Sequence, residues 1–304
     1  MMLIKDNLHD NTINTHDHPR HILEPKEAME EIVSSMAIEM SQLNGDIVIP
    51  ISGGIQSNFT AAIATAAGIH ADIIHINRNG EKSYGQESRN AHELAGFLKL
   101  PYQSISVNDE EILSYTEESI KTLSQYKDNY KINSNDIMNN TIWSILDNHF
   151  KDKIIIMGSG FNTLMGNGRG KTNDDLNKRV IYSHKRFFKT AEYASFSLSN
   201  NDLFVPSLTK TVFNSFSKIE YSIFNTTNII RQAASLLGVP DNTLRINHIS
   251  PMDSLSINEI INKKVISELK KYGENPRNEK DIISSLWIRN KTVSYTHLTL
   301  PTKA

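Results

Sequence analysis

The segment from Asp46 to Ser57, DIVIPISGGIQS, constrains the fold more than any other part of the 304-residue chain. An apolar, β-branched run ends at Ser52-Gly53-Gly54, and an alanine-rich stretch with good helix propensity follows. This pattern predicts a strand, a tight loop and the first turn of a helix. The glycines let an anion approach the backbone N–H groups, and the helix N-terminus adds unpaired donors and the positive end of its dipole. The segment therefore predicts a site for nucleotide phosphates, with Ser52 and Ser57 as hydroxyl donors at the two ends of the loop.

Strand and helix patterns alternate along the first 180 residues, which predicts a parallel sheet covered on both faces. Strands are expected at 46–51, 71–76, 101–107 and 153–157, and helices at 24–43, 55–67, 83–98 and 136–150 and from 109 onward. Beyond residue 179 only helices are expected, at 183–198, 207–219, 225–237 and 257–272. The predicted fold class is α/β, a doubly wound, mostly parallel sheet with a mainly helical C-terminal part.

The same patterns divide the chain into four parts. Residues 1–20 read as a flexible arm, 21–180 as the nucleotide-binding α/β part, and 181–292 as a helical, substrate-side part of the same domain. Residues 293–304, VSYTHLTLPTKA, resemble a translated sequencing adapter and are set aside as an artefact. On this reading the native C-terminus is missing, and the loss of an upstream domain is a second hypothesis.

Composition excludes several classes of function. The chain contains no cysteine, which rules out disulfides, thiolate metal sites and cysteine nucleophiles. Its formal net charge is -2, without a basic stripe, so nucleic acid is not expected as a partner. No apolar run approaches the ~20 residues needed to span a bilayer, and no signal peptide is evident. We therefore expect a cytoplasmic protein with no membrane contact.

A second glycine-rich turn, Gly158-Ser159-Gly160, follows the fourth predicted strand. In a doubly wound sheet, ligands bind beyond the C-terminal ends of the strands at a topological switch point, so the two glycine turns are expected to face one site. Neither turn carries the Walker or the dinucleotide-binding fingerprint. The Ser-Gly-Gly loop instead resembles that of the ATP pyrophosphatases, which reads Ser-Gly-Gly-x-Asp-Ser, with Gln56 in place of the aspartate. An ordinary βα turn is the alternative reading.

From about residue 21 to 249 the chain resembles the synthetase domain of asparagine synthetase and its relatives, including β-lactam synthetase. Besides the Ser-Gly-Gly loop, the matching motifs are E87xxxA91xxLA95xxL98, M157GSGFNTLMGN167, T227NIIR231 and R245IN247. The resemblance implies a fold of the adenine nucleotide alpha hydrolase-like (HUP) type. It also implies ATP as cofactor, adenylation of a carboxylate with release of pyrophosphate, and attack by an amine. The implied nucleotide site comprises Ser52, Gly53, Gly54, Ile55, Gln56, Ser57, Ile76, Gly158, Ser159 and Gly160.

Several charged residues of that family are replaced here by neutral ones. The two magnesium positions are Gln56 and Asn162, a neighbouring glutamate is Thr163, and the lysines of the two later motifs are Thr227 and Asn247. Amide oxygens bring no charge to Mg²⁺, so its binding is in doubt, and each missing transition-state donor would cost about 3 kcal/mol. Two hypotheses follow: a divergent amide-forming ligase, impaired in catalysis, or an inactive nucleotide-binding homologue that serves as a partner subunit. No catalytic residue is assigned.

If active, the protein would need a carboxylate substrate and an amine donor. The resemblance includes no glutaminase half, so ammonia would be free or supplied by a partner glutaminase or another partner enzyme. His75 is expected to be a core or pocket-rim residue. Side chains that could bind phosphate or metal, but are more simply read as solvated, are Arg78, Lys82, Arg169 and Lys171, the pair Asp174 and Asp175, and the N-terminal histidines His9, His16, His18 and His21. Trp143 and Trp287 are expected to be packing residues.

Overall fold

The computed structural model describes residues 23–78, 85–124, 134–158, 161, 199, 201–216, 218–219 and 226–244. Within this part of the chain, five parallel strands form one sheet in the order β3-β2-β1-β4-β5. The strands are β1 (Ile47–Pro50), β2 (Ala71–Arg78), β3 (Tyr102–Val107), β4 (Ile154–Ile156) and β5 (Asp202–Phe204). The predicted doubly wound parallel sheet is confirmed, with β1 at its centre.

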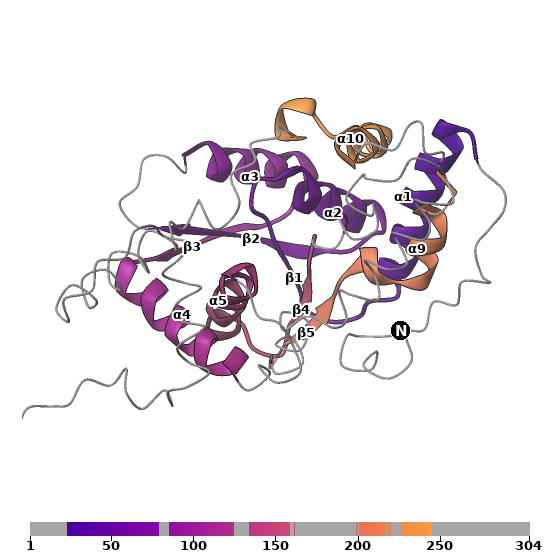
Figure 1. Ribbon diagram of the computed structural model, residues 1–304. Coiled ribbons are helices and arrows are strands. Elements are labelled where there is room, and N and C mark those ends of the chain that lie inside the picture. The colour runs from indigo at the N-terminus through magenta and orange to yellow at the C-terminus, as the bar shows by residue number, and fades with distance from the viewer. Residues whose placement is uncertain are drawn as a thin grey trace, which may run out of the picture.

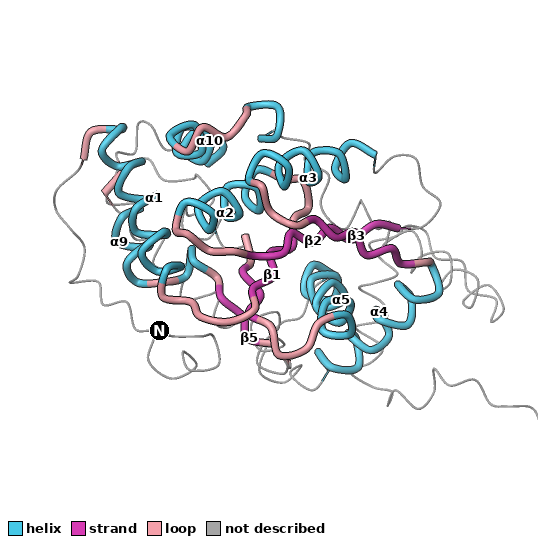
Figure 2. Tube along the Cα trace, turned by 180° about the vertical axis from the view of Figure 1, so that it is seen from behind, coloured by secondary structure: helices cyan, strands magenta, loops and turns pink. Residues whose placement is uncertain are grey.

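Helices cover both faces of the sheet, as Figure 1 and the reverse view in Figure 2 show. One face is covered by α2 (Ile55–Ala66) and α3 (Gly85–Leu98), together with α1 (Pro25–Ser41), α9 (Lys210–Phe216) and α10 (Thr226–Leu236). The other face is covered by α4 (Asp109–Ser124) and α5 (Ser134–His149). Strand residues alternate between the two cores: Ile47 and Ile49 pack on the α2 side, and Val48 packs on the α5 side.

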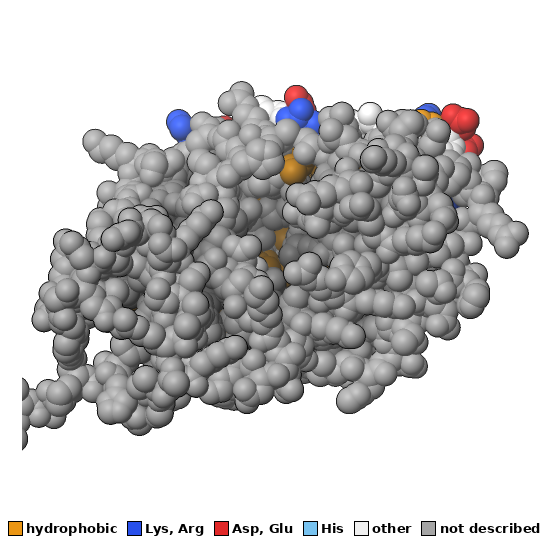
Figure 3. All heavy atoms as spheres, in the orientation of Figure 1, with side chains coloured by type: hydrophobic (Ala, Val, Ile, Leu, Met, Phe, Trp, Pro, Cys, Tyr) orange, Lys and Arg blue, Asp and Glu red, His pale blue; other side chains and the backbone are white. Residues whose placement is uncertain are grey.

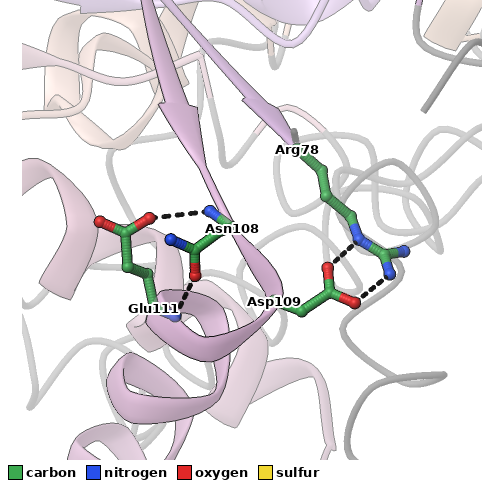
Figure 4. A network of polar contacts seen from close by, with 4 residues as sticks. All are labelled: Arg78, Asn108, Asp109 and Glu111. Atoms are coloured by element: carbon green, nitrogen blue, oxygen red, sulfur yellow. Dashed lines mark hydrogen bonds and ion pairs between the residues drawn. The ribbon is translucent and has the colours of Figure 1, made fainter. Parts of the chain in front are cut away.

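Local sequence explains where two of the helices begin. Pro25 occupies the first turn of α1, where its missing N–H costs no hydrogen bond. Asn108 and Glu111 form a capping box before α4, in which the Glu111 N–H donates to Asn108 Oδ1 (2.9 Å) and the Asn108 N–H donates to Glu111 Oε2 (2.8 Å) (Figure 4). This cap fixes the point at which the chain leaves β3.

The helix α2 is enclosed by the rest of the molecule. Its residues are buried without a break from Ser57 to Ala64, so it has no solvent-facing stripe over that stretch. It contacts β1 and β2 on the sheet and the helices α1, α3 and α10 around it. Alanines at 61, 62 and 64 allow this close approach from several sides.

The strand β5 was not expected from the sequence, which had suggested only helices beyond residue 179. It pairs with β4, with Ile154 opposite Asp202. The fully buried side chain of Asn201 holds its start: Nδ2 donates to Asp147 Oδ1 (2.7 Å) and to the Phe150 carbonyl (3.0 Å), and Oδ1 accepts from the Lys153 N–H (3.0 Å). This polar cluster joins α5, β4 and β5 at the N-terminal end of the sheet.

The helices expected at 207–219 and 225–237 are present as α9 and α10, accompanied by the short 3₁₀ helices η3 (Pro206–Leu208) and η5 (Asp241–Leu244). The helices expected at 183–198 and 257–272 lie outside the described residues, as do residues 1–20 and 293–304. Among the helices that the structure describes, none is long and apolar enough to span a bilayer.

Candidate functional site

The strand order places a topological switch point between β1 and β4. From β1 the sheet extends to β2 and β3 on one side, and to β4 and β5 on the other. The chain leaves β1 into the Ser52–Ser57 loop and leaves β4 at Met157 and Gly158. Because all five strands are parallel, both exits lie at the same edge of the sheet, where doubly wound folds bind their ligands.

The two glycine turns are in direct contact. A Cβ atom added to Gly158 would lie 2.6 Å from Ser57 Cα, 2.8 Å from Ser57 N and 3.1 Å from the Gln56 carbonyl carbon. All three are backbone atoms of the first turn of α2. Position 158, two residues after β4, must therefore be glycine for the chain to pass this close to the Ser52–Ser57 loop. Ser159 and Gly160, which complete the predicted turn, lie outside the described residues.

Gly53 is constrained by both its conformation and its neighbour. Its φ of +74° lies in the left-handed region, which side chains disfavour. A Cβ atom there would also lie 2.9 Å from the Glu87 carbonyl oxygen and 3.0 Å from Glu87 Cα. The loop is thus held between the start of α3, through Gly53, and the end of β4, through Gly158.

The hydroxyls of Ser52 and Ser57 form hydrogen bonds with backbone groups of their own loop. Ser57 Oγ accepts from the Ser52 N–H (3.3 Å) and donates to the Gly54 carbonyl (3.1 Å), and Ser52 Oγ accepts from the Gly54 N–H (3.3 Å). The two hydroxyl oxygens lie 3.3 Å apart. The sequence had suggested that both hydroxyls were donors for an anion, whereas here they preorganise the backbone that would receive it.

Several backbone donors of the loop stay unused. Gly54 is the N-cap of α2 in an extended conformation, with φ -83° and ψ 157°, and its carbonyl accepts the first intrahelical bond, from the Asn58 N–H (3.1 Å). Within the described part of the chain, no acceptor is found for the N–H groups of Gly53, Ile55 or Ser57. These donors stand at the positive end of the α2 dipole, an arrangement that suits an anion.

His75 and Ile76 lie at the end of β2, beside this loop. His75 is 3% exposed, and its Nδ1 lies 2.7 Å from the carbonyl oxygen of Ile51, the residue before the loop. Burial lowers the pKa of His75, against the opposing effect of that hydrogen bond. Ile76, assigned to the nucleotide site from the resemblance, is half-buried there. The expectation of a core or rim histidine is met by a side chain that contacts the entry to the loop.

Two further side chains near the loop were not assigned from the sequence. Glu87, 5% exposed, backs onto Gly53 at the start of α3. Asn58, fully buried on α2, donates from Nδ2 to the Thr243 carbonyl (2.5 Å) and so fastens η5 to the same helix. No sequence signal singled out Asn58, because it is one of several polar residues in α2. No sequence signal placed Glu87 against Gly53, since these residues lie on different elements.

The residues that the structure describes do not form a magnesium site. They include no group of three or more Asp, Glu or His side chains that could hold a metal ion. Gln56 is half-buried and brings an amide instead of a carboxylate to the family position. Asn162 and Thr163 lie outside the described residues. The one described family position thus brings no charge to Mg²⁺, and no step of the chemistry below is routed through the metal.

The remaining predicted positions are placed only in part. Thr227 lies in the first turn of α10, a helix that contacts α2, whereas Asn247 lies outside the described residues. Arg78 is the last residue of β2 and forms a bidentate ion pair with Asp109, with Nε to Oδ1 at 2.5 Å and Nη2 to Oδ2 at 2.7 Å (Figure 4). Arg78 is therefore not a freely moving loop cation, since its guanidinium is bound to Asp109.

The other sequence candidates divide between the core and the undescribed segments. Trp143 is 3% exposed in the core on the α5 side, as expected of a packing residue. Lys82, Arg169, Lys171, Asp174, Asp175, Trp287 and the four N-terminal histidines lie outside the described residues. Figure 3 shows acidic and basic side chains of described residues along the upper edge of the molecule, where Figure 1 places α3 and α10. Both signs of charge occur among the described side chains that are visible at this edge.

No protein-family model matches the chain, and no curated protein does. Solved structures match over most of it. An NMN synthetase from Francisella tularensis is 15% identical, with 89% of this chain and 95% of that chain covered and a TM-score of 0.40. An NH3-dependent NAD synthetase from Campylobacter jejuni is 16% identical, with 93% and 99% covered and a TM-score of 0.39. The U34-tRNA thiolase NcsA from Methanococcus maripaludis is 10% identical, with 88% and 80% covered and a TM-score of 0.39. Likenesses this distant assign no activity to this chain.

Proposed function

We propose that the chain binds ATP with its phosphates on the Ser52–Ser57 loop, and that it is a divergent ATP-dependent amide-forming ligase of the asparagine-synthetase-like kind. The contact of Gly158 with Ser57 carries this proposal, because it brings the exits of β1 and β4 together at the switch point. The unused N–H groups of Gly53, Ile55 and Ser57 supply the anion donors. An ordinary βα turn needs neither feature.

The reaction has two steps. A carboxylate oxygen of the substrate attacks the α-phosphorus of ATP, the bond to the bridging oxygen of pyrophosphate breaks, and an acyl-adenylate forms. An amine nitrogen then attacks the acyl carbon, loses a proton, and AMP leaves with the carbon–oxygen bond electrons. The loop amides would hold the departing pyrophosphate and stabilise the charge that develops on it. They cost no reorganisation, because the Ser52 and Ser57 hydroxyls already fix the loop.

A second candidate is an inactive nucleotide-binding homologue that supports an active partner in a biosynthetic assembly. The neutral side chain of Gln56 favours it, as do the neutral residues at the family's other charged positions, Asn162, Thr163, Thr227 and Asn247. Such a protein keeps the backbone cradle and lacks the charges that speed the reaction. The carboxylate substrate, the amine donor, a partner glutaminase and a cytoplasmic location all belong to the proposal.

Isothermal titration with ATP, with and without Mg²⁺, separates the two candidates, read together with an assay for AMP release in the presence of candidate carboxylates. Magnesium-dependent binding with AMP release supports the ligase. Binding that is indifferent to magnesium, with no AMP, supports the inactive homologue. Absence of any ATP binding refutes both. The variant Gln56→Asp restores the family's carboxylate and is expected to make binding more dependent on magnesium, while Gly96→Ala on the exposed side of α3 serves as the neutral control.

A further inference from the structure

The ladder between β1 and β2 ends in an unusual way beside the phosphate loop. The strands pair in parallel up to Pro50 and Ile74, and the Ile51 N–H then donates to the Ile74 carbonyl (2.7 Å). In a regular parallel ladder the next bond would run from the Ile76 N–H to the Ile51 carbonyl. That bond is not made in the structure. The Ile51 carbonyl is instead within 2.7 Å of His75 Nδ1.

The Ile76 N–H lies on the β1 side of β2, at a level of the sheet beyond the end of β1. The Ile73 N–H donates to the Pro101 carbonyl beside β3, so residues at odd positions of β2 face β3 and those at even positions face β1. Beyond Ile51 the chain turns into the Ser52–Ser57 loop, and within the described residues Ile76 N–H has no acceptor. Backbone N–H groups in protein interiors are nearly always paired, so one left open at the edge of a ligand site is a candidate ligand donor.

The imidazole of His75 explains how the ladder can stop here. The Ile51 carbonyl can only accept, so the contact fixes the tautomer with hydrogen on Nδ1. The ring is 3% exposed, and the surroundings favour its neutral form. The Ile51 carbonyl thus accepts a hydrogen bond from the His75 ring at the point where β1 turns away from β2. The Ile76 N–H is then not needed as the donor to this carbonyl.

We propose that His75 is a positioning residue: it takes over the Ile51 carbonyl and thereby leaves the Ile76 N–H free to bind the purine base of the nucleotide. This rests on the proposed nucleotide site and adds to it a reason for the histidine. The base would sit beside the end of β2, with its phosphates reaching the neighbouring loop.

Amide hydrogen exchange of the ligand-free protein tests the first half without any nucleotide. In the wild type the Ile76 amide is expected to exchange much faster than the Ile74 amide. In His75→Leu, which keeps an apolar side chain of similar size but has no donor, the Ile76 N–H is expected to pair with the Ile51 carbonyl and its exchange to slow. A protected Ile76 amide in the wild type, or unchanged exchange in His75→Leu, would overturn the proposal.

Titration with two probes tests the second half. His75→Leu is expected to weaken ATP binding about tenfold, as for the loss of one hydrogen bond, and to leave the affinity for inorganic pyrophosphate within about twofold. His75→Asn carries an amide donor near the position of Nδ1 and should restore the ATP affinity. Equal losses for both probes, or no loss for either, would refute the role of His75. If the wild type binds neither probe, the proposed function fails, while the exchange experiment still tests the release of Ile76.

Ser215→Ala provides the control for general destabilisation. Ser215 is 1% exposed on α9, and its hydroxyl lies 2.6 Å from Ser35 Oγ on α1, far along the chain from the loop. Removing it also deletes a buried hydrogen bond. The ratio of ATP to pyrophosphate affinity should stay at the wild-type value in this variant, so a changed ratio in His75→Leu alone cannot come from lower stability.

Discussion

The substitution Gly158→Ala tests the contact on which the site depends. The new methyl group would meet Ser57 Cα at 2.6 Å and Ser57 N at 2.8 Å, and both are backbone atoms that cannot rotate away. Ordinary contact begins near 3.4 Å, so the turn after β4 and the first turn of α2 must separate by about 0.8 Å. A displacement of this size changes the relation of the two halves of the site.

Two consequences of different size are expected. Forcing one methyl group into a packed region typically costs about 1–3 kcal/mol, and each kcal/mol lowers the melting temperature of a domain this large by roughly 2–4 °C. A misplacement near 1 Å can cost on the order of 100-fold where reacting groups must align. For binding alone we expect ATP affinity to fall at least about tenfold, the equivalent of one lost hydrogen bond.

Thermal unfolding and calorimetric titration with ATP measure the two effects separately. Gly96→Ala is the matched control, because a Cβ there meets nothing within 4 Å on the exposed side of α3. That variant should bind normally and gain about 0.5–1 kcal/mol, as alanine is the better helix former. The reasoning is refuted if Gly158→Ala melts and binds ATP like the wild type, because the close approach would then be absent in solution.

Three further outcomes are expected. Gly53→Ala should lower the free energy of unfolding by at least about 1–2 kcal/mol in a urea titration, because it combines a φ of +74° with a 2.9 Å clash against the Glu87 carbonyl; an unchanged midpoint would contradict this. Asn201→Leu should lower the free energy of unfolding by about 2–4 kcal/mol, because it removes one of the two donors to Asp147 Oδ1 and leaves the Lys153 N–H and the Phe150 carbonyl without their side-chain partner. The ATP affinity should stay the same, since Asn201 lies at the opposite end of the strands, and weakened binding would argue against that separation. Burial lowers the pKa of His75 below 6.5, so on acidification His75 is protonated in the unfolded chain before it is protonated in the folded one. The free energy of unfolding of the wild type should therefore fall as the pH drops through 6.5 towards the folded-state pKa. Urea titrations between pH 8 and 5 that show the same pH dependence for wild type and His75→Asn would rule this out.

The sheet and the Ser52–Ser57 loop between β1 and α2 could be predicted because their signals are local. The apolar run before Ser52 and the alanines of α2 specify a strand and a helix within about 20 residues, and the glycines between them mark the turn. The second glycine turn was assigned to the same site from the general rule for doubly wound sheets. That rule places both turns at one edge of the sheet, whereas the contact of Gly158 with Ser57 is seen only in the structure.

The strand β5 and the roles of the polar side chains could not be predicted in the same way. Asp202–Phe204 is only three residues long, and its strand character comes from pairing with β4 and from the Asn201 cluster, both distant in sequence. Likewise, Ser52 and Ser57 look like ligand donors in a linear motif, whereas the folded loop uses them for itself. The strand character of β5 and the roles of the two hydroxyls depend on which groups the fold brings together, and a single sequence gives little information on such contacts.

The enclosure of α2 has a mechanical consequence for how a ligand could be received. A helix that is buried over two turns, from Ser57 to Ala64, cannot tilt or slide without disturbing the sheet and three neighbouring helices together. The N-terminus of α2 is therefore expected to be rigid. Adaptation to different ligands must then come from the chain segments that lie beside it. Sequence changes during the divergence of such a protein are expected to accumulate in those segments, while the N-terminus of α2 keeps its conformation.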